Sequence, residues 1–228
     1  MVLSAPLRAE PDTRGARLTF VQAPDLAAAL RAGTAEPAPL VLWSFYSTEL
    51  GAIAPALLEA RAAHPDAVHV AGGPHPSAEP AATLALGFDF VAVGEGEAII
   101  VEMVKRIDQG RSLAGIAGLG HLDERGGYRS HGLAERHPLD RFPAHNAQDR
   151  RFGPIEITRG CIYACKFCQT PYLQKARFRH RSVENVRAHV RRMREHGLGY
   201  VRFVSPSSLS YGAAGEEPSL DAVVELLA

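Results

Sequence analysis

Short apolar runs alternate with helical patterns in the first half of the chain. Residues 39–45, 67–71 and 88–93 are apolar stretches with the length expected of strands that are buried on both faces. Between and after them, residues 50–60 and 98–107 repeat apolar side chains at helical spacing. Strands that alternate with helices of this length need crossover connections, so the pattern predicts a Rossmann-like parallel sheet. In that sheet, residues 39–45 are expected to form a central strand.

Glycine-rich loops follow the predicted strands. The run GGPHP at residues 72–76 precedes a predicted helix at residues 78–86, and the run GEGE occupies residues 94–97. Parallel sheets of this type bind ligands beyond the carboxyl ends of their strands. The residues expected to line such a crevice are Ser44, Gly72, Gly73, Gly94 and Glu95. A single glycine of this kind could equally serve only to make a tight turn.

The pattern is less regular outside these runs. Residues 17–21 are the only strand candidate before residue 39. Residues 118–122 and 128–130 flank a glycine-bearing turn and predict a hairpin. The polar, proline-bearing stretch at residues 131–146 is typical of a linker. We therefore expect a Rossmann-like domain over residues 1–112, a hairpin and linker over 113–150, and a second domain over 151–228.

The second domain begins with a predicted strand at residues 153–158. Ser182 can cap a following helix that Gly197 ends, and residues 200–204 predict the next strand. The buried stripe of that helix is expected to consist of Val183, Val186, Val190 and Met193. Another apolar-faced helix begins after Ser219, close to the last residue. Two strands cannot bury their own faces, and the outer one would present an unpaired edge, so we expect this chain to be a fragment of a longer protein.

All three cysteines of the chain lie in one eight-residue run. Cys161, Cys165 and Cys168 directly follow the first strand of the second domain. Three thiolates at this spacing can hold three irons of a cubane cluster and leave the fourth iron open to another ligand. A zinc site with His180 as fourth donor is the alternative, although structural zinc sites usually use paired Cys-x-x-Cys knuckles. A disulfide would leave one thiol unpaired.

Composition and charge narrow the classes of partner. The chain has 25 basic and 25 acidic residues, so its overall charge does not favour nucleic acid or an anionic membrane. We expect a cytoplasmic protein, because no apolar run approaches the roughly 20 residues of a transmembrane helix and no basic-then-apolar leader is present. A run of arginines near the predicted helix of the second domain could contact RNA, but a solvated surface is the favoured interpretation. These residues are Arg177, Arg179, Arg181, Arg187, Arg191, Arg192 and Arg194.

The cysteine run resembles the signature of the radical S-adenosylmethionine (SAM) enzymes, CxxxCxxC, with the aromatic Phe167 just before the last cysteine. The resemblance implies a partial (β/α)6 TIM barrel and a [4Fe-4S] cluster whose open iron is chelated by SAM. Reductive cleavage of SAM would then yield a 5'-deoxyadenosyl radical. By the same resemblance, Phe167 would lie beside the adenine, and an external donor such as flavodoxin or ferredoxin would supply the electron. Family members commonly carry a Gly-Gly-Glu-like segment for the SAM amino group, where this chain has Ser205 and Ser207.

The glycine-rich loops resemble those of the cobalamin-binding-type domain that precedes the barrel in one branch of the same superfamily. The resemblance covers about residues 18–107 and lacks the DxHxxG run that supplies a histidine to cobalt. His75 lies in a different loop, so cobalamin would have to bind without a protein ligand on cobalt.

The resemblance implies a radical SAM enzyme that acts on a small molecule, with cobalamin-dependent methyl transfer as its narrower form. The alternatives are a tRNA-modifying methylthiotransferase-like enzyme and a metal-binding module without catalysis. The residues themselves assign no catalytic acid or base.

Overall fold

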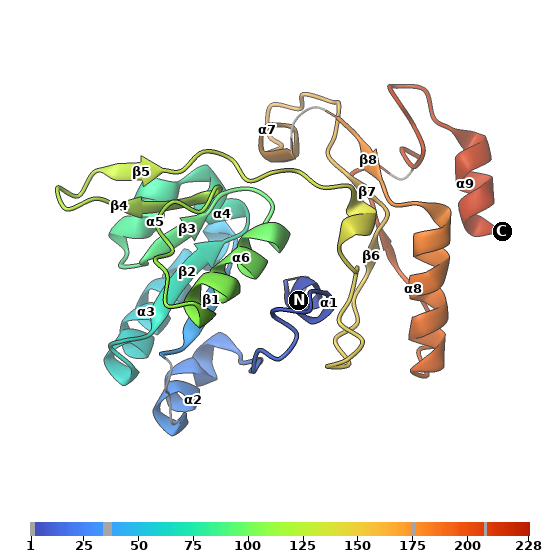
Figure 1. Cartoon of the computed structure of the whole chain (residues 1–228). Helices are drawn as coiled ribbons and strands as arrows, with labels where there is room; N and C mark the ends of the chain where they lie inside the picture. The colour runs from blue at the N-terminus through green and yellow to red at the C-terminus, as the bar shows by residue number, and fades with distance from the viewer. Residues whose placement is uncertain (1–2, 34–37, 175–176, 208) are drawn as a thin grey trace. The chain divides into compact units, whose positions relative to one another are not determined.

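The computed structural model describes residues 3–33, 38–174, 177–207 and 209–228, and it divides into two compact units (Figure 1). Residues 17–135 form the first, here called the Rossmann-like unit. The second, the cysteine-loop unit, combines the chain up to Ala16 with residues 136–228. These units differ from the domains expected from the sequence, because the N-terminal segment joins the cysteine-loop unit and the hairpin joins the Rossmann-like unit.

The Rossmann-like unit contains a five-stranded sheet in the order β1-β2-β3-β4-β5. The first three strands are parallel, and the last two form the predicted hairpin, which pairs antiparallel with β3 through Val91 and Gly120. The strands are β1 (Leu40–Ser44), β2 (Val68–Gly72), β3 (Phe90–Ala92), β4 (Leu119–Leu122) and β5 (Tyr128–Ser130). The predicted parallel sheet is therefore present, and the hairpin extends it into a mixed sheet.

Helices cover both faces of this sheet. Leu30, Ile53, Leu57 and Leu84 pack with Trp43 and its neighbours on one face, while Ile99 and Met103 pack with Val70 and Leu119 on the other. The helices are η1 (Ala23–Asp25), α2 (Leu26–Ala32), η2 (Ser47–Glu49), α3 (Leu50–Ala63), α4 (Pro74–Ala78), α5 (Pro80–Ala85) and α6 (Glu97–Asp108). Burial of both faces explains why the strands are almost continuously apolar.

Two expectations for this unit are wrong, and the weak strand candidate at residues 17–21 is not a strand. β1 is an edge strand and not a central one, and its Leu42 is 42% exposed. Residues 17–21 form no strand, so no described segment pairs with the free side of β1. The GGPHP run is not all loop, because Pro74 begins α4; proline suits the first turn of a helix, where its missing N–H costs nothing.

The cysteine-loop unit is built around two short strand pairs. β6 pairs parallel with β9, and β7 pairs antiparallel with β8. Its elements are α1 (Ser4–Ala9), η3 (Leu139–Arg141), β6 (Ile155–Glu156), β7 (Thr158–Arg159), α7 (Thr170–Gln174), β8 (Arg179–His180), α8 (Val183–Glu195), β9 (Phe203–Val204) and α9 (Leu220–Leu227). Val183, Val186 and Met193 of α8 pack on Ile155, as the predicted stripe requires. The Ser182 hydroxyl accepts from the Asn185 N–H at 3.2 Å, which confirms the predicted cap.

The stretch at residues 131–146 is not a simple linker. Leu139, Phe142, Ala144, His145 and Asn146 are all buried. Its polar and proline-rich composition suggested an exposed connection, but Leu139, Phe142 and Ala144 are apolar and enter the core. The segment therefore belongs to the folded cysteine-loop unit from Arg136 onward.

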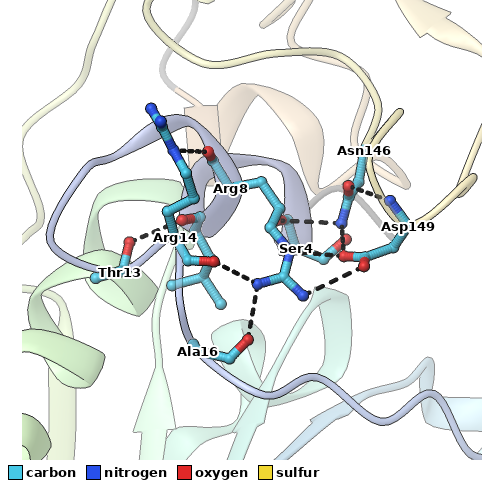
Figure 2. A network of polar contacts seen from close by, with 8 residues as sticks. Ser4, Arg8, Thr13, Arg14, Ala16, Asn146 and Asp149 are labelled. Atoms are coloured by element: carbon cyan, nitrogen blue, oxygen red, sulfur yellow. Dashed lines mark hydrogen bonds and ion pairs between the residues drawn. The ribbon is translucent and has the colours of Figure 1, made fainter.

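A network of hydrogen bonds around Arg8 connects the N-terminal segment, up to Ala16, to the rest of the cysteine-loop unit (Figure 2). The Arg8 guanidinium donates to both carboxylate oxygens of Asp149, at 2.8 and 3.2 Å, and to the carbonyls of Arg14 and Ala16 at 2.6 and 2.7 Å. Asn146 donates to the same carboxylate at 2.7 Å. The hydrogen bond from Arg8 is the main cause of the lowered pKa of Asp149.

Within the described residues, no helix is long and apolar enough to span a membrane.

Candidate metal and cofactor sites

β7 leads directly into the cysteine loop, residues 161–168. Gly160, between them, has a φ of 84°, a left-handed conformation that favours glycine. Its N–H donates to Gln174 Oε1 at 2.8 Å. On β7 itself, Arg159 donates to both carboxylate oxygens of Glu156 at 3.0 Å. The start of the loop is therefore held at the carboxyl end of a strand. The sequence predicted a parallel strand at this place, whereas β7 pairs antiparallel with β8.

The three thiols have different surroundings. Cys161 is buried and packs with Phe178 and Ala213, Cys165 is exposed, and Cys168 is half-buried. A turn joins the last two, because the Cys168 N–H donates to the Cys165 carbonyl at 3.0 Å. Hydrogen bonding from Thr170 lowers the pKa of the Cys168 thiol. The buried Cys161 thus marks the fixed end of the loop, and the other two thiols lie on its exposed turn.

The structure does not gather the three thiols into one ligand set. In the described part of the chain, no three His, Cys, Asp or Glu side chains lie close enough together to hold a metal ion. Thiols do not attract one another, and bonds to a metal usually supply the free energy that closes such a site. The three cysteine thiols still have the ligand chemistry of an iron–sulfur cluster, because sulfur is a soft ligand and all three lie in one loop. A hydrogen bond between Gly160 and Gln174 joins the two ends of the segment that contains this loop.

His180, the candidate fourth donor for zinc, is committed elsewhere. Its Nδ1 accepts from the Gly212 N–H at 3.2 Å and lies 3.0 Å from Thr158 Oγ1, and its Nε2 lies 2.9 Å from the Ala213 carbonyl. Nε2 must carry the proton to donate to that carbonyl, so neither ring nitrogen is left for a metal. This arrangement weakens the zinc alternative.

The residues expected to contact SAM are Phe167, Ser205 and Ser207, and they lie in two different loops of the cysteine-loop unit. Phe167 is 93% exposed, so its contact with an adenine stays a prediction. The Ser205 hydroxyl donates to the Ser207 carbonyl at 2.6 Å and lies 3.0 Å from Ser210 Oγ. Its hydroxyl proton is therefore used within the loop after β9, and the assignment of Ser205 or Ser207 to the SAM amino group stays a prediction.

The expected cobalamin-type residues lie at the carboxyl ends of β1, β2 and β3. Ser44 is the register partner of Gly72, and Gly94 and Glu95 follow β3. Gly73 has a φ of 90°, and a Cβ placed on it would lie 2.7 Å from Ser44 Oγ. The glycine is thus required both by its backbone conformation and by the close approach of Ser44.

Side chains of α4, the helix that follows β2, connect these three strand ends. His75 is buried, and its Nδ1 lies 2.9 Å from Oγ of Ser47, which begins η2 after β1. Ser77 Oγ accepts from the Gly94 N–H in the β3 loop at 3.1 Å. Ser47 and Ser77 were not among the residues expected at this edge of the sheet, and His75 was expected only as a loop residue. The only available signal was their position just after predicted strands.

The Gly73 geometry gives a testable prediction. Gly73→Ala should lower the free energy of unfolding of the Rossmann-like unit by about 1–3 kcal/mol from backbone strain, and further because the new Cβ crowds Ser44. Gly94→Ala is the matched control, since Gly94 also has a φ of 90° but nothing lies within 4 Å of a Cβ placed there.

Urea unfolding of both variants measures the difference. The double variant with Ser44→Ala and Gly73→Ala should regain the part of the free energy of unfolding that Gly73→Ala loses through contact of its new Cβ with Ser44 Oγ. Equal losses in Gly73→Ala and Gly94→Ala would contradict this account.

The arginine-rich stretch is partly used inside the protein. Arg179 donates to the His137 carbonyl, Arg181 to the Phe142 carbonyl, and Arg187 to the Glu225 carbonyl. Arg181 is only 4% exposed and cannot meet an external phosphate. The stretch is therefore not one continuous basic surface.

Comparison with known families finds two matching segments of the chain. Residues 12–104 match the B12 binding domain, and residues 155–227 match the radical SAM superfamily. An uncharacterised methyltransferase of Pyrococcus horikoshii is 31% identical over 136 residues, which cover 51% of this chain and 28% of that protein. The ribosomal protein uS12 methylthiotransferase RimO of Pseudothermotoga lettingae is 31% identical over 80 residues, which cover 35% and 18%. This chain therefore spans less than a third of either relative.

Solved structures share the fold. The radical SAM methyltransferase TsrM of Kitasatospora setae superimposes with a TM-score of 0.64 at 22% identity, over 81% of this chain and 39% of TsrM. The cobalamin-dependent SAM radical enzyme OxsB superimposes with a TM-score of 0.70 at 16% identity, over 99% of this chain and 34% of OxsB. The Rossmann-like and barrel expectations are thereby confirmed as fold assignments. Residues 155–227 of this chain are thus a segment of the radical SAM superfamily type, and a segment of the B12-binding type precedes them.

Proposed function

We propose that this chain is part of a radical SAM enzyme that cleaves SAM reductively and uses the resulting radical on a small-molecule substrate. The observation that carries the proposal is the cysteine loop, which contains every cysteine of the chain and follows β7 within the segment that matches the superfamily. Cys161, Cys165 and Cys168 would hold the cluster. When bound, a [4Fe-4S] cluster supplies the electron for SAM cleavage and an open iron for the SAM amino and carboxylate groups.

The loop's own geometry suggests how its residues would take up the cluster. Cys161 is buried against Phe178, so its position is set before any metal arrives. Cys165 and Cys168 share one turn, so they can approach Cys161 together. Packing on Phe178 also excludes water from the Cys161 side, which favours a reduced thiol or a metal–sulfur bond over oxidation.

We further propose that the Rossmann-like unit binds cobalamin, with no protein ligand on cobalt. Ser44, Gly72 and Gly73 offer hydroxyl and backbone groups at the carboxyl edge of the sheet, with Gly94 and Glu95 beside them. His75 is held by Ser47, and its ring packs at a tilt against Phe45 with the centroids 5.6 Å apart, which opposes a swing toward cobalt. Methyl transfer to carbon is the reaction class that this pair of cofactors would serve.

Two measurements test the proposal on the full-length protein after anaerobic reconstitution. Reduction in the presence of SAM should release 5'-deoxyadenosine, and cobalamin should bind with an absorption spectrum typical of a cobalt that lacks an imidazole ligand. Absence of 5'-deoxyadenosine would overturn the radical SAM activity. Cleavage without cobalamin binding would leave that activity in place and overturn the cobalamin proposal.

An external one-electron donor of the flavodoxin or ferredoxin type would supply the electron for the proposed reaction.

A methylthiotransferase activity is the second candidate function, and the similarity to RimO favours it. A methylthio group on the isolated product, in place of a methyl group, would decide for this second candidate.

A further inference from the structure

One hydrogen bond closes the segment that carries all three cysteines. The Gly160 N–H precedes Cys161 and donates to the side chain of Gln174, the last residue of α7, at 2.8 Å. The hydrogen bond therefore closes a loop of the chain that runs from Gly160 through the cysteine loop to the end of α7. The position of Gln174 therefore sets the width of the loop at its base.

Arg136 holds the same end of α7. Its two terminal nitrogens donate to the Gln174 carbonyl at 2.8 Å and to the Leu173 carbonyl at 2.9 Å. The last carbonyls of a helix have no partner within the helix, and a cation at this end also interacts favourably with the helix dipole. A planar guanidinium can donate to both carbonyls at once, whereas a lysine would reach one.

The segment that carries Arg136 is itself anchored. Arg179 on β8 donates to the His137 carbonyl at 2.8 Å, and β8 pairs with β7. The hydrogen bonds therefore form a ring of contacts. It runs from Gly160, next to β7, to Gln174 and Arg136, and returns from His137 through Arg179 on β8 to β7. All of these residues belong to the cysteine-loop unit, which Arg136 begins after residue 135.

We propose that Arg136 and Gln174 form a clamp that holds the base of the cysteine loop closed, and that both are positioning residues for the iron–sulfur cluster. The inference rests on the proposed function, because it concerns how this chain retains that cluster. The clamp fixes the loop's two ends while Cys165 and Cys168 close on Cys161. Without it, the same three thiols would have to be gathered from a wider and more variable loop, at a larger cost in chain entropy.

The clamp is tested by the rate at which a chelator removes iron from the reconstituted full-length protein. Arg136→Gln and Gln174→Ala should each accelerate cluster loss by about tenfold, as expected for one charge-assisted or well-formed hydrogen bond. The double variant should lose its cluster at about the rate of the faster single variant, because both substitutions act through Gln174. Arg136→Lys should be intermediate.

Arg191→Gln is the matched control, since Arg191 is exposed on α8 in the same unit and its loss changes the charge equally. It should leave the rate unchanged. Working well below the unfolding temperature of each variant keeps a general loss of stability from contributing.

A second readout needs no metal. In the metal-free protein, the Gly160 amide should exchange its hydrogen at least about tenfold faster in Gln174→Ala than in the parent chain. Equal cluster loss and equal exchange in the parent and the clamp variants would overturn the clamp. A parent protein that takes up neither iron nor sulfide would overturn the proposed function, while the exchange measurement would still decide whether the clamp exists.

Discussion

Replacing Cys165 with alanine is expected to abolish assembly of the iron–sulfur cluster and to reduce SAM cleavage by more than about a hundredfold. A cluster held by three protein thiolates has no substitute donor in this chain, because the only cysteines are Cys161, Cys165 and Cys168. His180, the nearest alternative considered from the sequence, uses both ring nitrogens inside the fold. Iron and sulfide analysis, with 5'-deoxyadenosine release on reduction, measures the effect.

Cys165 is the sharpest of the three positions to test. It is exposed and contributes nothing to the core, whereas Cys161 packs with Phe178 and Ala213. Cys161→Ala should therefore also lower the free energy of unfolding, by about 1 kcal/mol for the lost buried atoms. The neighbouring exposed Lys166→Gln is the control and should retain iron and sulfide. Full cluster content in Cys165→Ala would refute the ligand assignment.

Mild acid is expected to weaken both units of the protein. Burial lowers the pKa of His69, His145 and His189 from the ordinary 6.5 to about 4. In the unfolded chain each would take up a proton near pH 6.5, so the unfolded state binds more protons than the folded state between pH 6.5 and 4. Stability is complete above about pH 6.5 and falls as the pH drops toward 4. At pH 5.5 the loss is about 1.4 kcal/mol for each histidine.

The surroundings of these rings show why a proton is excluded. Trp43 Nε1 donates to His69 Nδ1 at 3.0 Å, so protonating that nitrogen would break the bond. The His145 and His189 rings pack edge to face with their centroids 4.7 Å apart, and a proton on one ring would disfavour a proton on the other. His69 Nε2, both His145 nitrogens and His189 Nδ1 are buried without a partner in the described structure.

Urea unfolding at pH 7.5 and 5.5 measures the acid effect. The midpoint should fall at the lower pH, and His145→Phe should reduce the pH dependence of the cysteine-loop unit specifically. His69 lies in the other unit, so the pH dependence of the Rossmann-like unit should persist in that variant. Identical stability at the two pH values would contradict the assignment of these histidines as buried and neutral.

The local elements of the fold were predictable from the sequence. β2, β3, α3, α6 and α8 follow from apolar periodicity, because each buries a face that its own residues define. The hairpin β4-β5 was predictable from its glycine-bearing turn. The family resemblance rested on the cysteine spacing and on glycine loops after strands, which are also local features.

Long-range contacts were not predictable in this way. Arg8 and Asp149 are separated by 141 positions, and nothing in either local pattern indicates that they meet. The pairing of Val91 with Gly120 places the hairpin in the sheet, and such pairing depends on register between distant strands. The clamp between Arg136 and Gln174 is of the same kind, since a lone arginine in a polar segment has no periodicity to mark it.

The most direct measurement is the metal and sulfide content of the anaerobically reconstituted protein, with an electron paramagnetic resonance spectrum of the reduced sample. The account predicts about four irons and four acid-labile sulfides per chain, together with a reduced-cluster signal that SAM alters. Zinc in place of iron, with no labile sulfide, would contradict it.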